Sequence, residues 1–439
     1  MKFIVNSTAL LKELQKLNSV ISSNNTLPIL SIAVDSVYFW DEEVGIHLVG
    51  INGNYGCDGT WSNYNQDWER PISLEYYATN GVLGFKINAG VKIFGGCSRA
   101  HEQKSLAIYT KKYDSETIYY QIFGDKPINE FKSFVLRNSG SDWSHTPHYN
   151  NNGSMMRDAM MQSLVKNRMD IDYQAYQPSI IYINGKYWGI LNIREKLNGD
   201  YLAANHNIDP DNVDILKRNI TIYAGDANHF YSILNFIESN GVVLDSNYDH
   251  IKTQIDIDEY INYQISQIYF GNQDWPWNNI KYWRPRTNNG KWRWILYDTD
   301  SGFNLNDPNG FSHNTLEIAS SWNGDPNCIF LQNCGENDDM EKYLFYKLLE
   351  NNDFKNKFIN RMAYHLNTSF KSTRVIDIVD SLSSIINQEM HKHINRWGDA
   401  ITYDSWQSNL DIIREFANQR VPEIQQHILE KFKKGKNEL

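Results

Sequence analysis

The chain has 439 residues with 41% hydrophobic and 13% aromatic content, enough for a packed core and for two or three structural units. Its 52 acidic residues outnumber its 42 basic residues, and the net charge of −10 excludes the basic surplus of a nucleic-acid-binding face. No segment approaches the ~20 apolar residues of a membrane span. The first residues lack a basic segment followed by a long apolar one, so the chain is expected to stay in the cytoplasm.

The predicted elements change in character along the chain. Residues 1–26 are predicted to form a helical extension, because an apolar stripe recurs at helical spacing. Residues 27–136 are predicted to be β-rich, since short apolar or alternating segments are broken by Gly, Asn and Asp. Residues 304–439 predict a polar loop region followed by helices. This order lacks alternating βα units and therefore favours an α+β fold.

The intervening region, residues 137–303, mixes helical and strand patterns. A helix is predicted to begin after Ser154, whose side chain is expected to cap it. Further along, Asn184-Gly185 stands between two strand-like segments and predicts a two-residue hairpin turn of a primed type. Residues 258–270 predict another helix, apolar along one face.

The segment KWRWILYDTDSGF, residues 291–303, predicts a strand that ends in two carboxylates. Side chains two positions apart on a strand point to the same side, so Asp298 and Asp300 are expected to face one direction. Two ionised carboxylates this close repel each other, and a divalent cation or a shared proton removes the conflict. The alternative is that both residues only cap a loop.

The preceding loop, GNQDWPWNN, contains Asp274 and Asn279 at the D-x4-N spacing that a kinase catalytic loop uses for its base and a metal ligand. Pro276 forces a turn and places Asp274 in a loop. Oxygen ligands from Asp and Asn suit Mg²⁺ or Mn²⁺. Together with Asp298 and Asp300, the spacing favours a phosphotransfer site. A simple turn is the alternative interpretation.

Three further charged residues lie near predicted strand ends. Lys104 follows a Gly-Gly pair and precedes the strand-like SLAIY, a position from which it can reach nucleotide phosphates, with Arg99 nearby to assist. Glu195 follows the predicted hairpin and can help to hold a base or ribose. The alternative for Lys104 and Glu195 is a solvated strand end.

The four cysteines are too few for a disulfide framework. Cys328 and Cys334 flank a Gly/Asn-rich loop, and these two cysteines could form a disulfide if the protein is exported.

Taken together, several segments resemble the CotH kinase-like family, which is related to the spore-coat protein H of endospore formers. The matching segments lie in the family's order over residues 27–432, and include GVKIFGGCSRAHEQKSLAIY, YINGKYWGILNIREK, NQDWPWNN and KWRWILYDTDSGF. Residues 1–30, by contrast, resemble the start of a bacterial sliding clamp, but nothing later shows that protein's repeated domains.

The resemblance implies a highly diverged protein-kinase-like core in residues 137–303, with a nucleotide and metal site. It implies transfer of phosphate from ATP to Ser/Thr residues of a protein partner. Lys104 would be the phosphate-binding lysine, Glu195 would lie at the nucleotide-binding linker, and Asp274 would be the catalytic carboxylate. The residues implied to hold Mg²⁺ or Mn²⁺ are Asn279, Asp298 and Asp300.

The sequence differs from that of a typical protein kinase in two places: Asn272-Gln273 replace the usual His-Arg before the catalytic Asp, and there is no GxGxxG loop. These differences bear on catalytic turnover more than on nucleotide binding. Two other function classes stay open. One is a non-catalytic surface, cell-wall or carbohydrate-binding module, which the aromatic content and Asn/Gly-rich loops suit. The other is a glycoside hydrolase, which needs a carboxylate pair about 5–10 Å apart. Its candidate carboxylates are Asp274, Asp298, Asp300 and Glu195.

Overall fold

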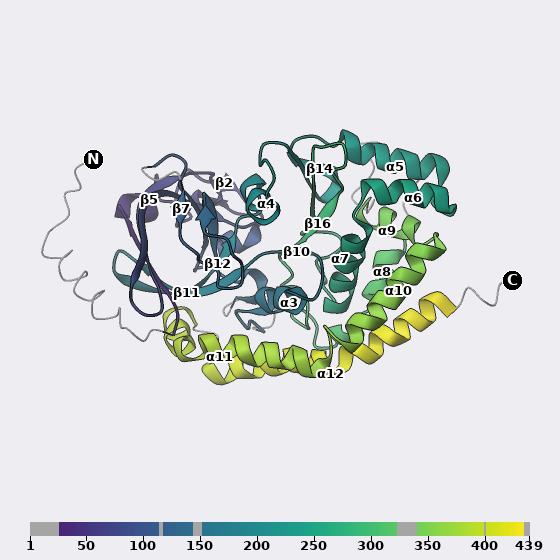
Figure 1. Cartoon of the computed structure of the whole chain (residues 1–439). Coiled ribbons are helices and arrows are strands. Elements are labelled where there is room, and N and C mark those ends of the chain that lie inside the picture. The colour runs from purple at the N-terminus through teal and green to yellow at the C-terminus, as the bar shows by residue number, and fades with distance from the viewer. Residues whose placement is uncertain (1–25, 114–116, 144–151, 323–339, 399–400, 434–439) are drawn as a thin grey trace, which may run out of the picture. The chain divides into compact units, whose positions relative to one another are not determined.

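The structure, a computed structural model, describes residues 26–113, 117–143, 152–322, 340–398 and 401–433 (Figure 1). The chain forms two compact units, and neither is one continuous stretch. The first unit comprises Met1–Met155, Ala175–Asn205 and Leu382–Gln407, and the second comprises Met156–Gln174, His206–Ser381 and Ser408–Leu439. The first unit therefore draws on all three predicted regions, 27–136, 137–303 and 304–439. Residues 1–25 of the predicted helical extension lie outside the described residues.

The first unit is built around a seven-stranded sheet that closes on itself in the order β1-β11-β12-β9-β6-β5-β4 (Figure 1). Its strands are β1 Ile29–Val34, β4 Arg70–Tyr77, β5 Leu83–Phe94, β6 Ser105–Tyr109, β9 Ser133–Arg137, β11 Tyr176–Ile183 and β12 Lys186–Glu195. Strand β1 pairs parallel with β11, and the other neighbours pair antiparallel. The predicted β-rich character of this part of the chain is confirmed.

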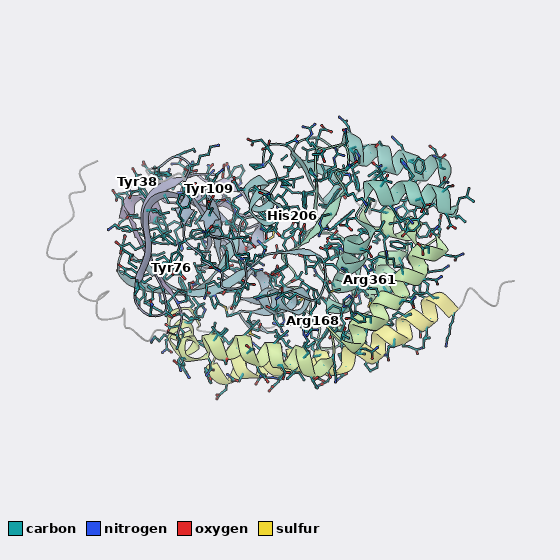
Figure 2. All side chains as sticks on the ribbon, in the orientation of Figure 1. Tyr38, Tyr76, Tyr109, Arg168, His206 and Arg361 are labelled. Carbon is teal, nitrogen blue, oxygen red and sulfur yellow. A yellow bond between two sulfur atoms is a disulfide. The ribbon has the colours of Figure 1, made fainter. Side chains whose placement is uncertain are left out.

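The turn between β11 and β12 has the predicted form. Asn184 has φ 50° and Gly185 has φ 74°, so both central residues lie in the left-handed region that a primed turn requires. Across the sheet, Tyr76 of β4 stacks on Phe85 of β5, with ring centroids 5.2 Å apart (Figure 2).

Shorter elements surround this sheet in the first unit. They are α2 Ser36–Trp40, the hairpin of β2 Asn54–Tyr55 and β3 Trp61–Ser62, the pair β7 Ile118–Tyr119 and β8 Glu130–Phe131, and α4 Gly199–His206, whose last residue belongs to the second unit. Three 3₁₀ turns are η1 Asn63–Asn65, η2 Cys97–Ala100 and η3 Gly140–Asp142.

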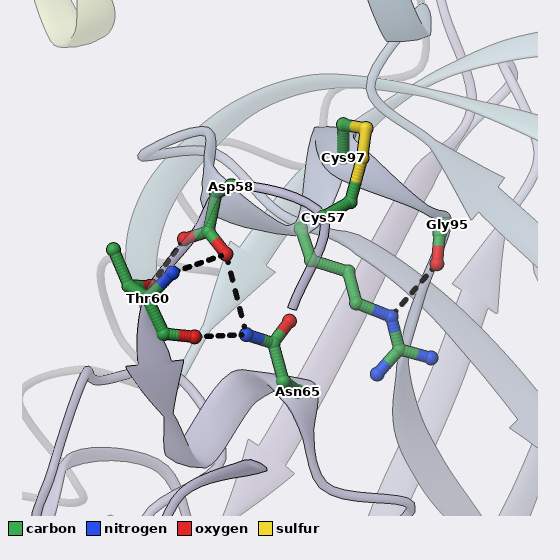
Figure 3. Close-up of a disulfide and its surroundings, with 7 residues drawn as sticks. Cys57, Asp58, Thr60, Asn65, Gly95 and Cys97 are labelled. Atoms are coloured by element: carbon green, nitrogen blue, oxygen red, sulfur yellow. Dashed lines mark hydrogen bonds between the residues drawn. A yellow bond between two sulfur atoms is a disulfide. The ribbon is translucent and has the colours of Figure 1, made fainter. Parts of the chain in front are cut away.

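A disulfide joins Cys57, in the loop of the β2–β3 hairpin, to Cys97 at the start of η2 (Figure 3). The two Cα atoms are 4.8 Å apart, although 40 residues separate the cysteines in the sequence. The sequence analysis missed this pair because no local pattern relates positions so far apart. The pair that it considered, Cys328 and Cys334, lies outside the described residues.

The second unit contains a five-stranded sheet in the order β10-β16-β15-β13-β14. Its strands are β10 Asp172–Tyr173, β13 Val213–Lys217, β14 Thr221–Ala224, β15 Lys281–Pro285 and β16 Arg293–Leu296. Its helices and 3₁₀ turns are α3 Arg157–Val165, η5 Arg218–Ile220, α5 Asn228–Asn240, α6 Asp245–Gln254, α7 Ile257–Phe270, η6 Gly310–Ser312, α8 Thr315–Ser320, α9 Met340–Leu348 and α10 Asn352–Asn367.

Two longer helices, α11 Ser372–Trp397 and α12 Tyr403–Lys433, contribute residues to both units. The helical C-terminal part is thus confirmed, and with the β-rich first part it confirms the α+β class. Within the second unit, Asp258 of α7 forms ion pairs with Lys357 at 2.9 Å and with Arg361, both on α10. Arg361 is labelled in Figure 2. In the part of the chain that the structure describes, no helix has the length and apolar character needed to cross a bilayer.

The predicted capping of α3 by Ser154 is wrong. The helix begins at Arg157, and its N-cap residue Met156 makes no side-chain capping bond. Ser154 instead donates its backbone N–H and its hydroxyl to the carboxylate of Asp142, each at 2.7 Å. A nearby buried carboxylate has therefore taken the serine that the local pattern assigned to the helix.

Candidate functional site

The end of helix α7 positions the first group of candidate residues. Helix α7 stops at Gly271, which has φ 58°, and the chain turns into the loop of Asp274. The buried guanidinium of Arg420 donates to the carbonyl oxygens of Ile268 at 2.6 Å and Tyr269 at 3.0 Å. The last carbonyls of a helix have no partner within the helix, so these bonds fix the end from which the loop starts.

Asp274, Asn279 and Asp298 come together in the second unit. The Asn279 amide donates to Asp274 Oδ2 at 2.8 Å and to the Asp298 carbonyl at 3.3 Å. All three residues are half-buried. Burial raises the pKa of the Asp274 carboxyl, and the charge of Asp298 raises it further, against the lowering effect of hydrogen bonds from Asn278 and Asn279. Burial and the charge of Asp298 therefore both disfavour ionisation of the Asp274 carboxyl.

The local geometry of Asp298 and Asp300 differs from the prediction. Strand β16 ends at Leu296, and Asp298 has φ 52° in the left-handed region. The expectation that the two residues lie on a strand is wrong, so the two-residue alternation does not apply to them. Asp298 is half-buried, whereas Asp300 is only 2% exposed.

Helix α3 makes hydrogen bonds to the loop that carries Asp298 and Asp300. The buried Asp158 carboxylate accepts hydrogen bonds from the Thr299 N–H at 2.9 Å and the Thr299 hydroxyl at 3.0 Å. Arg157 Nε donates to the Phe303 carbonyl at 3.3 Å. Sequence reasoning did not find the link between Asp158 and Thr299, because 141 residues separate them and no local pattern relates the two.

Lys104 and Arg99 come together in the first unit, beside turn η2. The Lys104 amine donates to the carbonyls of Arg99 at 2.6 Å and His101 at 3.0 Å, and lies 4.0 Å from the centroid of the Tyr64 ring. Burial lowers the pKa of Lys104 to about 8, while the charges of Asp58 and Glu102 act to raise it.

The Arg99 guanidinium is also engaged within this group. Its Nε donates to the Gly95 carbonyl at 2.7 Å, and its Nη1 donates to the Tyr64 carbonyl at 3.0 Å. Burial lowers the pKa of Arg99. The alternative of a solvated strand end is wrong for Lys104, which is 4% exposed.

Glu195, at the end of β12, is buried and has three hydrogen-bond donors within the first unit. They are Lys126 Nζ at 2.6 Å, the Ala175 N–H at 2.8 Å and Asn205 Nδ2 at 2.9 Å. A solvated strand end is therefore wrong for Glu195 as well. Lys126, its ion-pair partner, was not singled out from the sequence. No spacing pattern relates two residues 69 positions apart.

The sequence model of the family described as CotH kinase protein matches residues 91–423 of the chain. The chain belongs to the CotH kinase family. None of the curated proteins matches it. In this family member, the matched segment contains all the candidate site residues from Arg99 to Asp300, and begins after the β2–β3 hairpin. The family name agrees with a kinase-like function.

The oxygen donors near Asp274 fit a hard divalent cation in this member of the CotH kinase family. Within the described residues, no group of three or more His, Cys, Asp and Glu side chains forms a metal site. Magnesium, however, usually binds through one or two carboxylates together with substrate phosphates and waters. The Asp274 carboxylate and the Asp298 backbone, linked by the Asn279 amide, place two acidic residues in one group that matches that smaller set.

Proposed function

We propose that this CotH kinase-family protein transfers the γ-phosphate of ATP to Ser/Thr hydroxyls of a protein substrate, with Mg²⁺ or Mn²⁺. The observation that carries the proposal is the meeting of Asp274, Asn279 and Asp298 in one half-buried group. Phosphoryl transfer needs charge stabilisation and positioning more than covalent chemistry by the protein, and such a group can supply both. Residues 137–303 would then contain most of a diverged kinase-like core.

Each candidate residue has a role in this proposal. Asp274 orients the acceptor hydroxyl and accepts its proton, and its raised pKa suits a proton acceptor. Asp298 and Asn279 hold the cation, and Asp300 follows Asp298 by two residues in the loop after β16. A bound cation would neutralise charge on the phosphates.

The proposal also needs positive charge to offset that of the nucleotide phosphates. Lys104 and Arg99 are positioned together at turn η2 and would offset the charge of the nucleotide phosphates. Glu195 accepts hydrogen bonds from Lys126 and two other donors. It would therefore support the nucleotide site by holding these residues in place. In this proposal, Lys104 and Arg99 take the place of the missing GxGxxG loop as the source of phosphate contacts.

The disulfide bears on where this chemistry takes place. Disulfides form and persist in oxidising compartments and are rare in the cytoplasm. The Cys57–Cys97 bond therefore favours an exported setting over the cytoplasmic location that the sequence predicted.

The proposal predicts that Asp274→Ala abolishes labelling from γ-labelled ATP. The wild-type protein, given Mg²⁺ or Mn²⁺ and a protein acceptor, should form acid-stable Ser/Thr phosphate, because Asp274 orients the hydroxyl and accepts its proton. The loss should be at least about 100-fold, the usual contribution of a general base. Asp211→Ala, which removes an exposed carboxylate of the same unit, is the matched control. Equal labelling in all three proteins, or none in any, contradicts the proposal.

A second candidate function, a carbohydrate-binding surface, is favoured by one observation. Tyr55 and Trp61 of the β2–β3 hairpin are 64% and 68% exposed, and their ring centroids are 5.8 Å apart. Large aromatic rings exposed side by side are a usual platform for ligands with an apolar face. In a thermal-shift comparison, this candidate predicts stabilisation by cell-wall glycans that is lost in Trp61→Ala, with no response to ATP and Mg²⁺.

A further inference from the structure

The groups that hold the Lys104 amine come from two segments that are far apart in sequence. One is the hairpin segment, residues 54–65, and the other is the turn segment, residues 95–101. The turn segment provides the two carbonyl acceptors of the amine, and the hairpin segment provides the aromatic ring beneath it. The disulfide between Cys57 and Cys97 is the covalent connection between these two segments (Figure 3).

Further hydrogen bonds hold Tyr64, one from the turn segment to its backbone and one within the hairpin segment from its hydroxyl. Arg99 of the turn segment donates to the Tyr64 carbonyl at 3.0 Å, and the Tyr64 hydroxyl donates to Asp58 at 2.5 Å. Asp58 stands next to the disulfide, and Thr60 also donates to its carboxylate (Figure 3). Asp58, the residue beside the crosslink, therefore helps to fix the ring under the lysine and acts to raise the Lys104 pKa.

We propose that the Cys57–Cys97 disulfide is a positioning element of the nucleotide half-site, because it holds the hairpin segment and the turn segment around the Lys104 amine. The link to a nucleotide rests on the proposed function, whereas the effect on the amine does not. A dithiol opens the crosslink by exchange: the Sγ–Sγ bond breaks, two protein thiols form, and the dithiol is oxidised to its cyclic disulfide.

The pH dependence of acylation at Lys104, followed by peptide mass spectrometry, tests this positioning. In the oxidised protein the midpoint should lie at about 8, as burial sets the pKa of this amine. After reduction the two segments separate and water reaches the amine, so the midpoint should rise by about one pH unit or more towards that of an ordinary lysine. The titratable and charged neighbours are the Tyr64 phenol, the Arg99 guanidinium, Asp58, Glu102 and His47. His47 is neutral in this range because burial lowers its pKa to about 3.

Three comparisons make the result specific to the crosslink. The double variant Cys57→Ser/Cys97→Ser should show the raised midpoint and no further response to dithiol. Asp58→Asn keeps the disulfide but removes a favourable charge, so its midpoint should fall. Lys112, whose side chain is 73% exposed in the same unit, should keep an unchanged profile throughout.

A merely structural crosslink would lower the melting temperature and leave the Lys104 midpoint in place. Circular dichroism of the reduced wild type and of the double variant, well below their melting temperatures, identifies which samples are folded. If either folded sample keeps the oxidised midpoint, the proposal is overturned. Should the double variant not fold, the reduced wild type decides.

ATP affinity, measured on the same samples, separates this proposal from the proposed function. Opening the crosslink should weaken binding about tenfold, the size of effect expected when a charged hydrogen bond is lost. A shifted midpoint with unchanged ATP affinity supports the positioning and counts against a nucleotide contact by Lys104. An unshifted midpoint overturns the positioning whatever the affinity.

Discussion

Replacing Asp298 by asparagine is expected to lower the rate of phosphate transfer by about 10³-fold at ordinary Mg²⁺ concentrations. The substitution preserves side-chain size and removes the charge that would hold the cation. It also removes the charge that, after burial, contributes most to raising the Asp274 pKa. Because the Asp298 carbonyl, which accepts from Asn279, belongs to the backbone, that contact should survive.

The measurement is the initial rate as a function of Mg²⁺ concentration. Loss of a cation ligand should raise the Mg²⁺ concentration for half-maximal rate, and Mn²⁺ should restore part of the activity, because Mn²⁺ generally binds a given set of ligands more tightly than Mg²⁺ does. Asp211→Asn, at an exposed position of the same unit, is the matched control and should follow the wild type. Wild-type rates and an unchanged Mg²⁺ requirement in Asp298→Asn would remove this residue from the metal site.

The local part of the site was predictable from the sequence. The D-x4-N spacing places Asp274 and Asn279 in one short loop, and the structure joins them by a hydrogen bond. The pattern also singled out Asp298, which joins the same group. The strand geometry assumed for it was wrong, because a left-handed residue directly after a strand leaves no trace in hydrophobic alternation.

The long-range part of the site was not predictable from local patterns. The sequence allowed Lys104 and Glu195 to be exposed charges at strand ends, but in the structure both side chains are buried. Backbone carbonyls accept hydrogen bonds from Lys104, and Lys126 forms an ion pair with Glu195. These partners stabilise the buried charges, and they come from the connections between strands of the closed sheet. A buried charge must be paired or hydrogen-bonded, but the sequence does not say by which residue.

The fold shows the same division. Strand and helix content followed from alternation and helical spacing, and Asn184-Gly185 specified its turn. The parallel pairing of β1 with β11 closes the sheet across about 150 residues of chain, as the contact between Val34 and Asn184 shows. No short-range signal carries such a pairing, so the closed order appeared only in the structure.

Replacing Asp158 by alanine is expected to slow phosphate transfer about 100-fold, the usual effect of displacing a catalytic group by about 1 Å. The Asp158 carboxylate holds both the backbone N–H and the hydroxyl of Thr299, the residue that follows Asp298. Without it, these two donors and the buried Gln162 amide lose their acceptor, which should also lower the free energy of unfolding by roughly 1–3 kcal/mol. Asp298 would then leave the position from which it meets Asn279.

A double-mutant cycle separates positioning from stability. Thr299→Val removes only the hydroxyl bond and should have a smaller effect, whereas Thr299→Ser keeps a hydroxyl and serves as the control. Because Asp158 and Thr299 share that bond, the double variant Asp158→Ala/Thr299→Val should be less impaired than the product of the single effects. Rates are compared per folded molecule, with unfolding followed by denaturant titration. If Asp158→Ala is less stable but transfers phosphate at the wild-type rate when folded, helix α3 supports the fold and does not set the position of Asp298.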